Sequence, residues 1–126
     1  MSSDPRTRIL DAIRPALPDG WDEMPYTVRS VGQLRKSAVF LDYTAINHDG
    51  MPPGQVYDQW EIALVSKLAD YTKAEEEIDP VVRDVIRLLD AATDLAWSGA
   101  TKRGVADAYL AWIITVQQIS HTTHQE

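Results

Sequence analysis

The sequence QVYDQWEIALVSKL, residues 55–68, is the segment around which the predicted fold is organised. Apolar side chains recur on one side of it: Val56, Trp60, Ile62, Leu64 and Leu68. More polar side chains recur on the other side: Tyr57, Gln59, Glu61 and Lys67. A period of two with one apolar face predicts a β-strand that is buried on one side and wet on the other.

This strand is long for a small domain. At about 3.3 Å per residue, residues 55–68 would span roughly 46 Å. A globule of 126 residues would be about 36 Å across. A straight strand of that length would project from its own domain. The sequence therefore predicts either a bulge or a partner outside the domain.

The preceding segment supplies a partner strand. Residues 38–46 also alternate, but both of their faces are largely apolar, which predicts an interior strand. Residues 47–54, NHDGMPPG, separate the two strands and are rich in turn-forming residues. Because this loop is too long to fix the register by turn type, the strand faces must fix it. We expect a long β-hairpin with its tip at residues 47–54.

Two Asp-Pro pairs, at residues 4–5 and 79–80, resemble helix starts. Aspartate is a favoured N-cap, and proline is tolerated at the first helical position. The first helix is expected to end near Ile13 or Arg14, before a proline. The second carries an apolar stripe from Val82 to Ala96 and is expected to stop at Gly99.

The remaining segments complete the predicted architecture. Residues 21–28 suggest a short edge strand, residues 70–78 an acidic connector, and residues 109–119 another strand, with a further short strand possible at residues 97–105. Residues 121–126 are expected to be a frayed tail. The sequence thus predicts one α+β domain over residues 1–126. Its mostly antiparallel sheet would contain the long β-hairpin and carry both main helices packed on one face.

Composition excludes several classes of function. The net charge is −7: residues 1–36 hold six basic and five acidic residues, and residues 37–126 hold six and fourteen. An acidic body argues against binding the phosphate backbone of DNA. The chain has no cysteine, so it has no disulfide or thiolate chemistry. Its longest apolar run, residues 108–116, is short for a membrane span, which needs about 20 residues, and no signal peptide is visible.

No group of residues predicts catalysis or metal binding. His121 and His124, with Glu126, have the spacing of a ligand pair but sit in the polar tail. The carboxylates of residues 75–77 and Asp79 are better interpreted as a solvated connector than as a magnesium site. No phosphate-binding, nucleophile or zinc motif occurs. We therefore expect no enzyme activity, cofactor or metal.

The chain carries four tryptophans that could form a stacking platform for nucleic-acid bases. Such a platform comes with a basic groove, which the acidic body lacks. Trp60 and Trp112 are in phase with the apolar faces of their strands. We expect both to be core residues.

The order of the motifs resembles the tail terminator proteins of long-tailed, non-contractile-tailed bacteriophages. A short N-terminal helix leads to LPDGW and the strand AVFLDY, followed by YDQWEIALVS, DPVVRDVIRLLD and a closing YLAWIITVQ. The resemblance spans roughly residues 5–120. It lies in hydrophobic pattern and element order, so no catalytic residues are carried over.

The resemblance implies a structural role in the virion. Such proteins form a hexameric ring on the head-proximal end of the tail tube, end tail polymerisation and provide the head–tail joining surface. The implied partners are copies of the chain itself, the tail tube protein and the head–tail connector protein. DNA would pass through the ring without specific binding. The implied location is the phage tail, assembled in the host cytoplasm.

The over-long hairpin suggests where subunits meet. We expect contacts at its tip and at the acidic connector: Asn47, His48, Asp49, Met51, Asp70, Lys73, Glu75 and Glu76. Three alternatives remain open at this point. The chain could be another neck or head-completion component, an unrelated oligomeric interaction domain, or a small enzyme with a pocket between sheet and helices.

Overall fold

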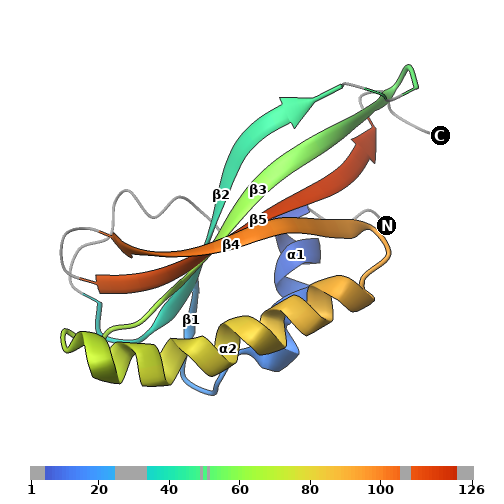
Figure 1. The fold of residues 1–126 in the computed structure, drawn as a ribbon. Coiled ribbons are helices and arrows are strands. Elements are labelled where there is room, and N and C mark those ends of the chain that lie inside the picture. Colours follow the sequence, from blue (N-terminus) through green and yellow to red (C-terminus); the bar gives the residue numbers. More distant parts are fainter. Residues whose placement is uncertain (1–4, 25–33, 49, 51, 106–108, 122–126) are drawn as a thin grey trace.

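The computed structural model describes residues 5–24, 34–48, 50, 52–105 and 109–121. It confirms the α+β class: helices pack against a five-stranded, mostly antiparallel sheet (Figure 1). The elements follow one another along the chain as α1 (Pro5–Ile13), the short 3-10 helix η1 (Arg14–Ala16), β1 (Asp22–Met24), β2 (Ala38–Asn47), β3 (Gln55–Val65), α2 (Tyr71–Ala91), β4 (Leu95–Val105) and β5 (Tyr109–His121).

The strands lie in the order β1-β2-β3-β5-β4, so β3 is the central strand. It pairs antiparallel with β2 on one side and with β5 on the other, and β4 pairs antiparallel with β5. The predicted edge strand at residues 21–28 exists as β1, but it runs parallel to β2. Residues 25–28 lie outside the described part of the chain.

The alternation predicted for β3 is confirmed on its apolar face. Val56, Trp60, Ile62 and Leu64 are buried. The opposite face is wet over the first half of the strand, where side chains are partly exposed, but Ala63 and Val65 are buried there as well. The strand itself ends at Val65 rather than Leu68.

The expected bulge lies in the partner strand. The register between β2 and β3 shifts between Tyr43 and Ala45. β2 therefore carries one extra residue, Thr44, at this point, which locally increases the twist of the pair.

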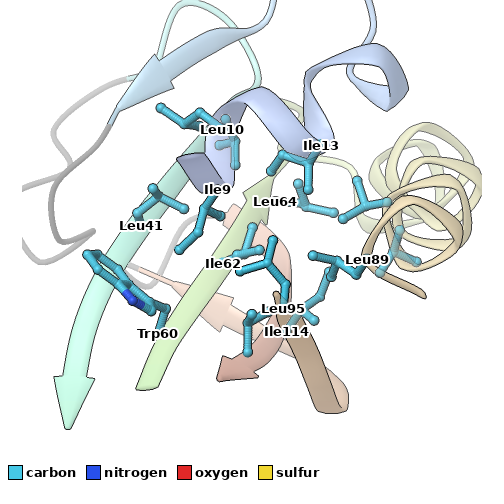
Figure 2. Packing of buried hydrophobic residues seen from close by; sticks show 14 of the residues in the cluster. Ile9, Leu10, Ile13, Leu41, Trp60, Ile62, Leu64, Leu89, Leu95 and Ile114 are labelled. Atoms are coloured by element: carbon cyan, nitrogen blue, oxygen red, sulfur yellow. The ribbon is translucent and has the colours of Figure 1, made fainter. Parts of the chain in front are cut away.

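Both helices cover one face of the sheet, as predicted. Figure 2 shows α1 lying over β2 and β3, with side chains of helix and strands meeting between the layers. The largest fully buried side chains of this cluster come from α1, α2 and the central strands: Ile9, Ile13, Leu41, Trp60, Ile62, Leu64, Leu89 and Ile114. A smaller apolar cluster occupies the other face: Ala38, Phe40, Ala63, Val65, Val105, Ala111 and Ile113.

The predicted acidic connector at residues 70–78 is wrong, because most of this segment is the beginning of α2. Asp70 is the N-cap: its carboxylate accepts hydrogen bonds from the backbone N–H groups of Thr72 and Lys73 at 2.9 and 3.3 Å. Pro80 lies inside the helix, where proline typically costs about 3 kcal/mol. Ala74 and Ile78 are fully buried, and their packing offsets that cost.

The predicted C-terminus of the second helix is also wrong. α2 ends at Ala91, and Gly99 lies within β4, where the pairing with β5 shifts register between Trp97 and Gly99. Ala96, which fits the helical stripe, is part of that strand. Leu95 is buried at the start of β4. The cross-strand pairing outweighs the continuing helical pattern.

A buried hydrogen-bond network fixes the first turns of α2 to the sheet. The hydroxyls of Ser37 and Ser66, both buried, donate to the carboxylate of Glu77 at 2.9 and 2.5 Å. The backbone N–H of Lys67 donates to the Ser37 hydroxyl at 3.0 Å. Glu77 therefore ties the helix to the ends of β2 and β3.

Replacing Asp70 with alanine should lower the free energy of unfolding by about 1 kcal/mol, because two N–H groups lose their capping partner. Chemical denaturation of the two proteins measures the difference. Glu76→Ala, at an exposed position of the next turn, is the matched control and should leave the midpoint near that of the parent. An unchanged midpoint for Asp70→Ala would contradict the cap assignment.

Trp60→Ala should cost about 3–5 kcal/mol, because it removes a large side chain that is 1% exposed. The change in unfolding free energy can be read from denaturant melts. Met24→Ala, which removes a large side chain that is 39% exposed, is the comparison and should cost much less. Equal losses in the two variants would show that Trp60 is not a core residue.

Candidate functional site

The predicted contact residues do not form one surface. Asn47 is the last residue of β2, and His48 follows it and is exposed. Asp70, Lys73, Glu75 and Glu76 belong to the cap and first turns of α2. Figure 1 shows these two groups at opposite ends of β3, whose eleven residues span about 36 Å. Asp49 and Met51 lie outside the described residues.

The projecting arm has three strands rather than two. We define the arm as residues 42–47, 55–60 and 116–121, from β2, β3 and β5. β3 pairs with β5 out to Gln55 and His121, so β5 supports the hairpin along its whole length. Figure 1 shows the arm extending past the region that the helices cover. The predicted two-stranded projection is therefore replaced by a thicker one.

A stacked pair of aromatic rings lies on the helix-facing side of the arm. The rings of Tyr43 and Trp60 are 4.5 Å apart with an interplanar angle of 9°. The Tyr43 hydroxyl donates to Asp58, which is only 5% exposed, at 2.5 Å. Burial together with this carboxylate raises the pKa of Tyr43 to about 12. The guanidinium of Arg6 lies 5.1 Å from the Trp60 ring centre, in the range of a cation–π contact.

The bulge in β2 places the apolar side chain of Ile46 on the same face of the arm as this aromatic pair. Tyr43 pairs with Trp60 and Ile46 pairs with Asp58, so both project to the face on which Trp60 is buried. Ile46 is 63% exposed and Tyr43 is 40% exposed. We call these two side chains the apolar knob. Two partly exposed apolar side chains therefore lie on the same face of the arm.

The two edges of the sheet have no described strand partner: β1 with the following part of β2 forms one edge, and β4 forms the other. β1 pairs with residues 38–40 of β2, so within the described ranges residues 41–47 have β3 as their one neighbour. β4 has β5 on one side and no described strand on the other. We call these segments the β2 edge and the β4 edge. Each presents backbone N–H and C=O groups that a further strand could use.

A groove runs between α2 and the β4–β5 side of the sheet. It has a volume of about 370 Å³. The helix lines one wall through residues spaced along one face, and the strands form the floor: Asp79, Val82, Arg83, Ile86, Trp97, Ala100 and Trp112. Trp112, predicted to be a core residue, is thus half-buried and borders the groove. We call this feature the α2 groove.

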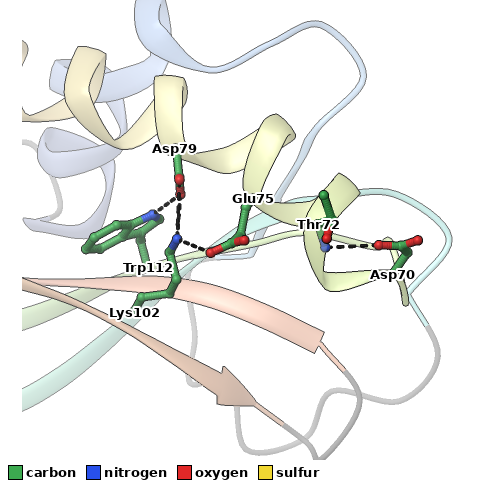
Figure 3. A network of polar contacts seen from close by, with 6 residues as sticks. All are labelled: Asp70, Thr72, Glu75, Asp79, Lys102 and Trp112. Atoms are coloured by element: carbon green, nitrogen blue, oxygen red, sulfur yellow. Dashed lines mark hydrogen bonds and ion pairs between the residues drawn. The ribbon is translucent and has the colours of Figure 1, made fainter.

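Asp79 and Trp112, which line the α2 groove, also belong to a polar cluster (Figure 3). The indole N–H of Trp112 donates to Asp79 at 2.7 Å, and the ammonium of Lys102 lies 3.0 Å from the same carboxylate. Lys102 also bonds Glu75 at 2.8 Å and lies 5.2 Å from the Trp112 ring centre. Burial acts to raise the pKa of Asp79, but the bonds from Trp112 and Lys102 lower it overall. These contacts join α2 to β4 and β5, the wall of the groove to its floor.

The described residues offer no grouping suited to a metal ion. Among them, no cluster of three or more His, Cys, Asp or Glu side chains is placed to hold one. His121 ends β5, and the two residues that could accompany it as ligands, His124 and Glu126, fall outside the described part. In that same part, no helix is long and apolar enough to span a membrane.

Compared with known proteins, the sequence matches no protein-family model and no curated protein. The resemblance to tail terminator proteins therefore rests on the motifs of the chain itself.

Of the surfaces described here, the sequence pointed to the hairpin and missed the α2 groove. Residues 79, 82, 83 and 86 follow helical spacing, but Arg83 has the polarity of a solvent-facing position. Trp97 and Trp112 approach α2 because β4 pairs with β5. The one available signal was the presence of two tryptophans on neighbouring strands.

The lowered pKa of Asp79 predicts an acid-dependent loss of stability. Its carboxylate stabilises the fold above its unfolded pKa of about 4, and this contribution disappears as the pH falls through the lower folded pKa. Between about pH 5 and pH 2, the parent should therefore lose more unfolding free energy than Asp79→Asn. Denaturant melts at several pH values measure both slopes.

A double-mutant cycle provides the control. In a Trp112→Phe/Lys102→Met background, the two hydrogen-bond donors that lower the pKa of Asp79 are removed and only the weaker influence of Arg83 remains. There the Asp79→Asn substitution should change the pH slope much less. An equal effect in both backgrounds would rule out the Trp112 and Lys102 contacts as its cause.

Proposed function

We propose that this protein is a subunit of a hexameric ring that caps the head-proximal end of the tail tube of a long-tailed, non-contractile-tailed phage. The observation that carries the proposal is the pair of unlike strand edges, the β2 edge and the β4 edge, on opposite sides of one sheet. The resemblance in motif order supplies the kind of ring.

Two unlike edges favour head-to-tail assembly. A subunit that contacts its neighbours through two different surfaces makes heterologous contacts, and these close into a ring when each step rotates by an equal fraction of a turn. Exposed edges on an isolated domain also favour uncontrolled pairing, which natural sheets avoid by covering them. Neighbouring subunits that cover the β2 and β4 edges would form the ring and would also prevent uncontrolled strand pairing.

The ends of the molecule are suited to different axial partners. The tip of the arm and the start of α2 lie at opposite ends of the central strand (Figure 1). Under the proposal, one end meets the tail tube protein and the other meets the head–tail connector protein. The exposed Glu75 and Glu76 and the net charge of −7 suit a passage through which DNA moves without adhering.

Electron microscopy of tail tube assembly tests this function. Tail tube protein of the same phage is polymerised with and without the purified chain. We expect six-membered rings at one end of each tube and shorter tubes as the chain is added in increasing amounts. Denatured chain is the control and should leave tube length unchanged.

Two results would count against the proposed function. Tubes of unchanged length with bare ends would exclude a cap. Rings bound to DNA-filled heads and absent from tubes would instead identify a head-completion component of the neck.

A further inference from the structure

We propose that residues 71–79 of α2 open as one unit at Pro80, while residues 81–91 stay packed on the sheet. We call residues 71–79 the latch segment. This inference goes beyond the proposed function, because it concerns a conformational change within a single chain and holds whatever assembly the chain forms. It follows from the presence of two helix-start signals in α2, one at Asp70 and the other at Asp79.

The two helix-start signals are both complete. Asp70 is the N-cap in the structure, where its carboxylate accepts hydrogen bonds from the backbone N–H groups of Thr72 and Lys73. Asp79 and Pro80 form the second signal, since aspartate is a favoured N-cap and proline suits the first helical position. A helix that began at Pro80 would keep about three turns of α2.

Pro80 weakens α2 at the junction between the two signals. It lies inside the helix and has no N–H, so the carbonyl of Glu76 receives no helical hydrogen bond from it, and the ring crowds the same carbonyl. Proline also disfavours the helical conformation of the residue before it, which is Asp79. In a helix that started at Pro80 these costs would vanish, because the first helical position needs no N–H. Opening the latch segment therefore removes an unfavourable interaction.

The two parts of α2 pack against different apolar clusters. After Pro80, four side chains belong to the main core: Val81, Val82, Val85 and Leu89. Before Pro80, Ala74 and Ile78 form a separate cluster with Leu110. The main core includes α1 and the central strands, whereas the separate cluster has three buried members. The latch segment can therefore leave the sheet while the main core stays closed.

Hydrogen bonds and ion pairs make the other links between the latch segment and the sheet. The carboxylate of Glu77 accepts from the hydroxyls of Ser37 and Ser66 at 2.9 and 2.5 Å. The ammonium of Lys102 lies 2.8 Å from the carboxylate of Glu75. Water replaces each of these partners once the segment opens, so the net contribution of each bond to stability is small. These contacts hold the segment closed but make it less stable than the main core.

The carboxylate of Asp79 has two competing uses. In the structure it accepts the indole N–H of Trp112 at 2.7 Å and lies 3.0 Å from the ammonium of Lys102. In a helix that started at Pro80, the same carboxylate would accept from backbone N–H groups of the first turn, at residues 81 and 82. One side chain thus stabilises both the closed and the open form, which gives the segment two defined states.

Native-state hydrogen exchange of the purified chain tests this opening. Backbone amides of residues 74–79 should exchange at least about tenfold faster than those of residues 85–89, with a step at Pro80. Sub-denaturing guanidinium should accelerate exchange steeply in residues 85–89 and only slightly in residues 74–79, because opening the latch segment exposes less surface than global unfolding. A gradual change along α2, or the same guanidinium dependence in both sets, would overturn the proposal.

Replacing Pro80 tests the hinge itself. The residue is exposed, so Pro80→Ala leaves no internal cavity. It should slow exchange at every amide of residues 74–79 by the same factor, about tenfold or more, because all of them exchange through one opening that proline favours. Pro18→Ala, at an exposed position between η1 and β1, is the matched control and should leave these rates unchanged. Factors that diminish toward Asp70 would indicate fraying of the helix end and would contradict opening as a unit.

The outcomes are separable from those of the tube assay. A step in exchange at Pro80 in a protein that fails to cap tubes would support the latch segment and reject the proposed function. Capping by a chain whose α2 exchanges without a step would support the function and overturn this inference.

Discussion

The continuous pairing of β3 with β5 is the constraint on which the rest of the structure depends. The register runs unbroken from Gln55 opposite His121 to Val65 opposite Ala111. It carries the sheet past the region that α1 and α2 cover, so the arm must cover its own inner face. The stack of Tyr43 on Trp60 closes the core at that point. Beyond it, Ile46 is 63% exposed.

Local alternation predicted the strands well because a buried face imposes a period of two directly on the residues. The long strands and the apolar face of β3 follow from that rule. The start of α2 could not be predicted the same way. Asp79 and Pro80 form a strong local cap signal, whereas the true cap, Asp70, depends on the burial of Ala74 and Ile78 against distant strands.

The two candidate surfaces also differ in whether they are local in sequence. The β2–β3 hairpin is local in sequence, and its excess length was visible from residue spacing alone. The α2 groove is nonlocal, since it needs β4 to pair with β5 and α2 to lie across both. Gly99 concealed β4 by resembling a helix stop. Trp112 alternates like a core residue and yet lies at the border of the groove.

Hydrogen exchange of backbone amides most directly tests whether the two strand edges are subunit contacts. The measurement compares the dilute chain with the same chain in assembled tails, resolved by peptide mass spectrometry. The account predicts slower exchange on assembly in residues 41–47 of β2 and also in β4, because both edges gain hydrogen-bond partners. Unchanged exchange in both edges, or slowing in one edge alone, would contradict head-to-tail assembly through the sheet.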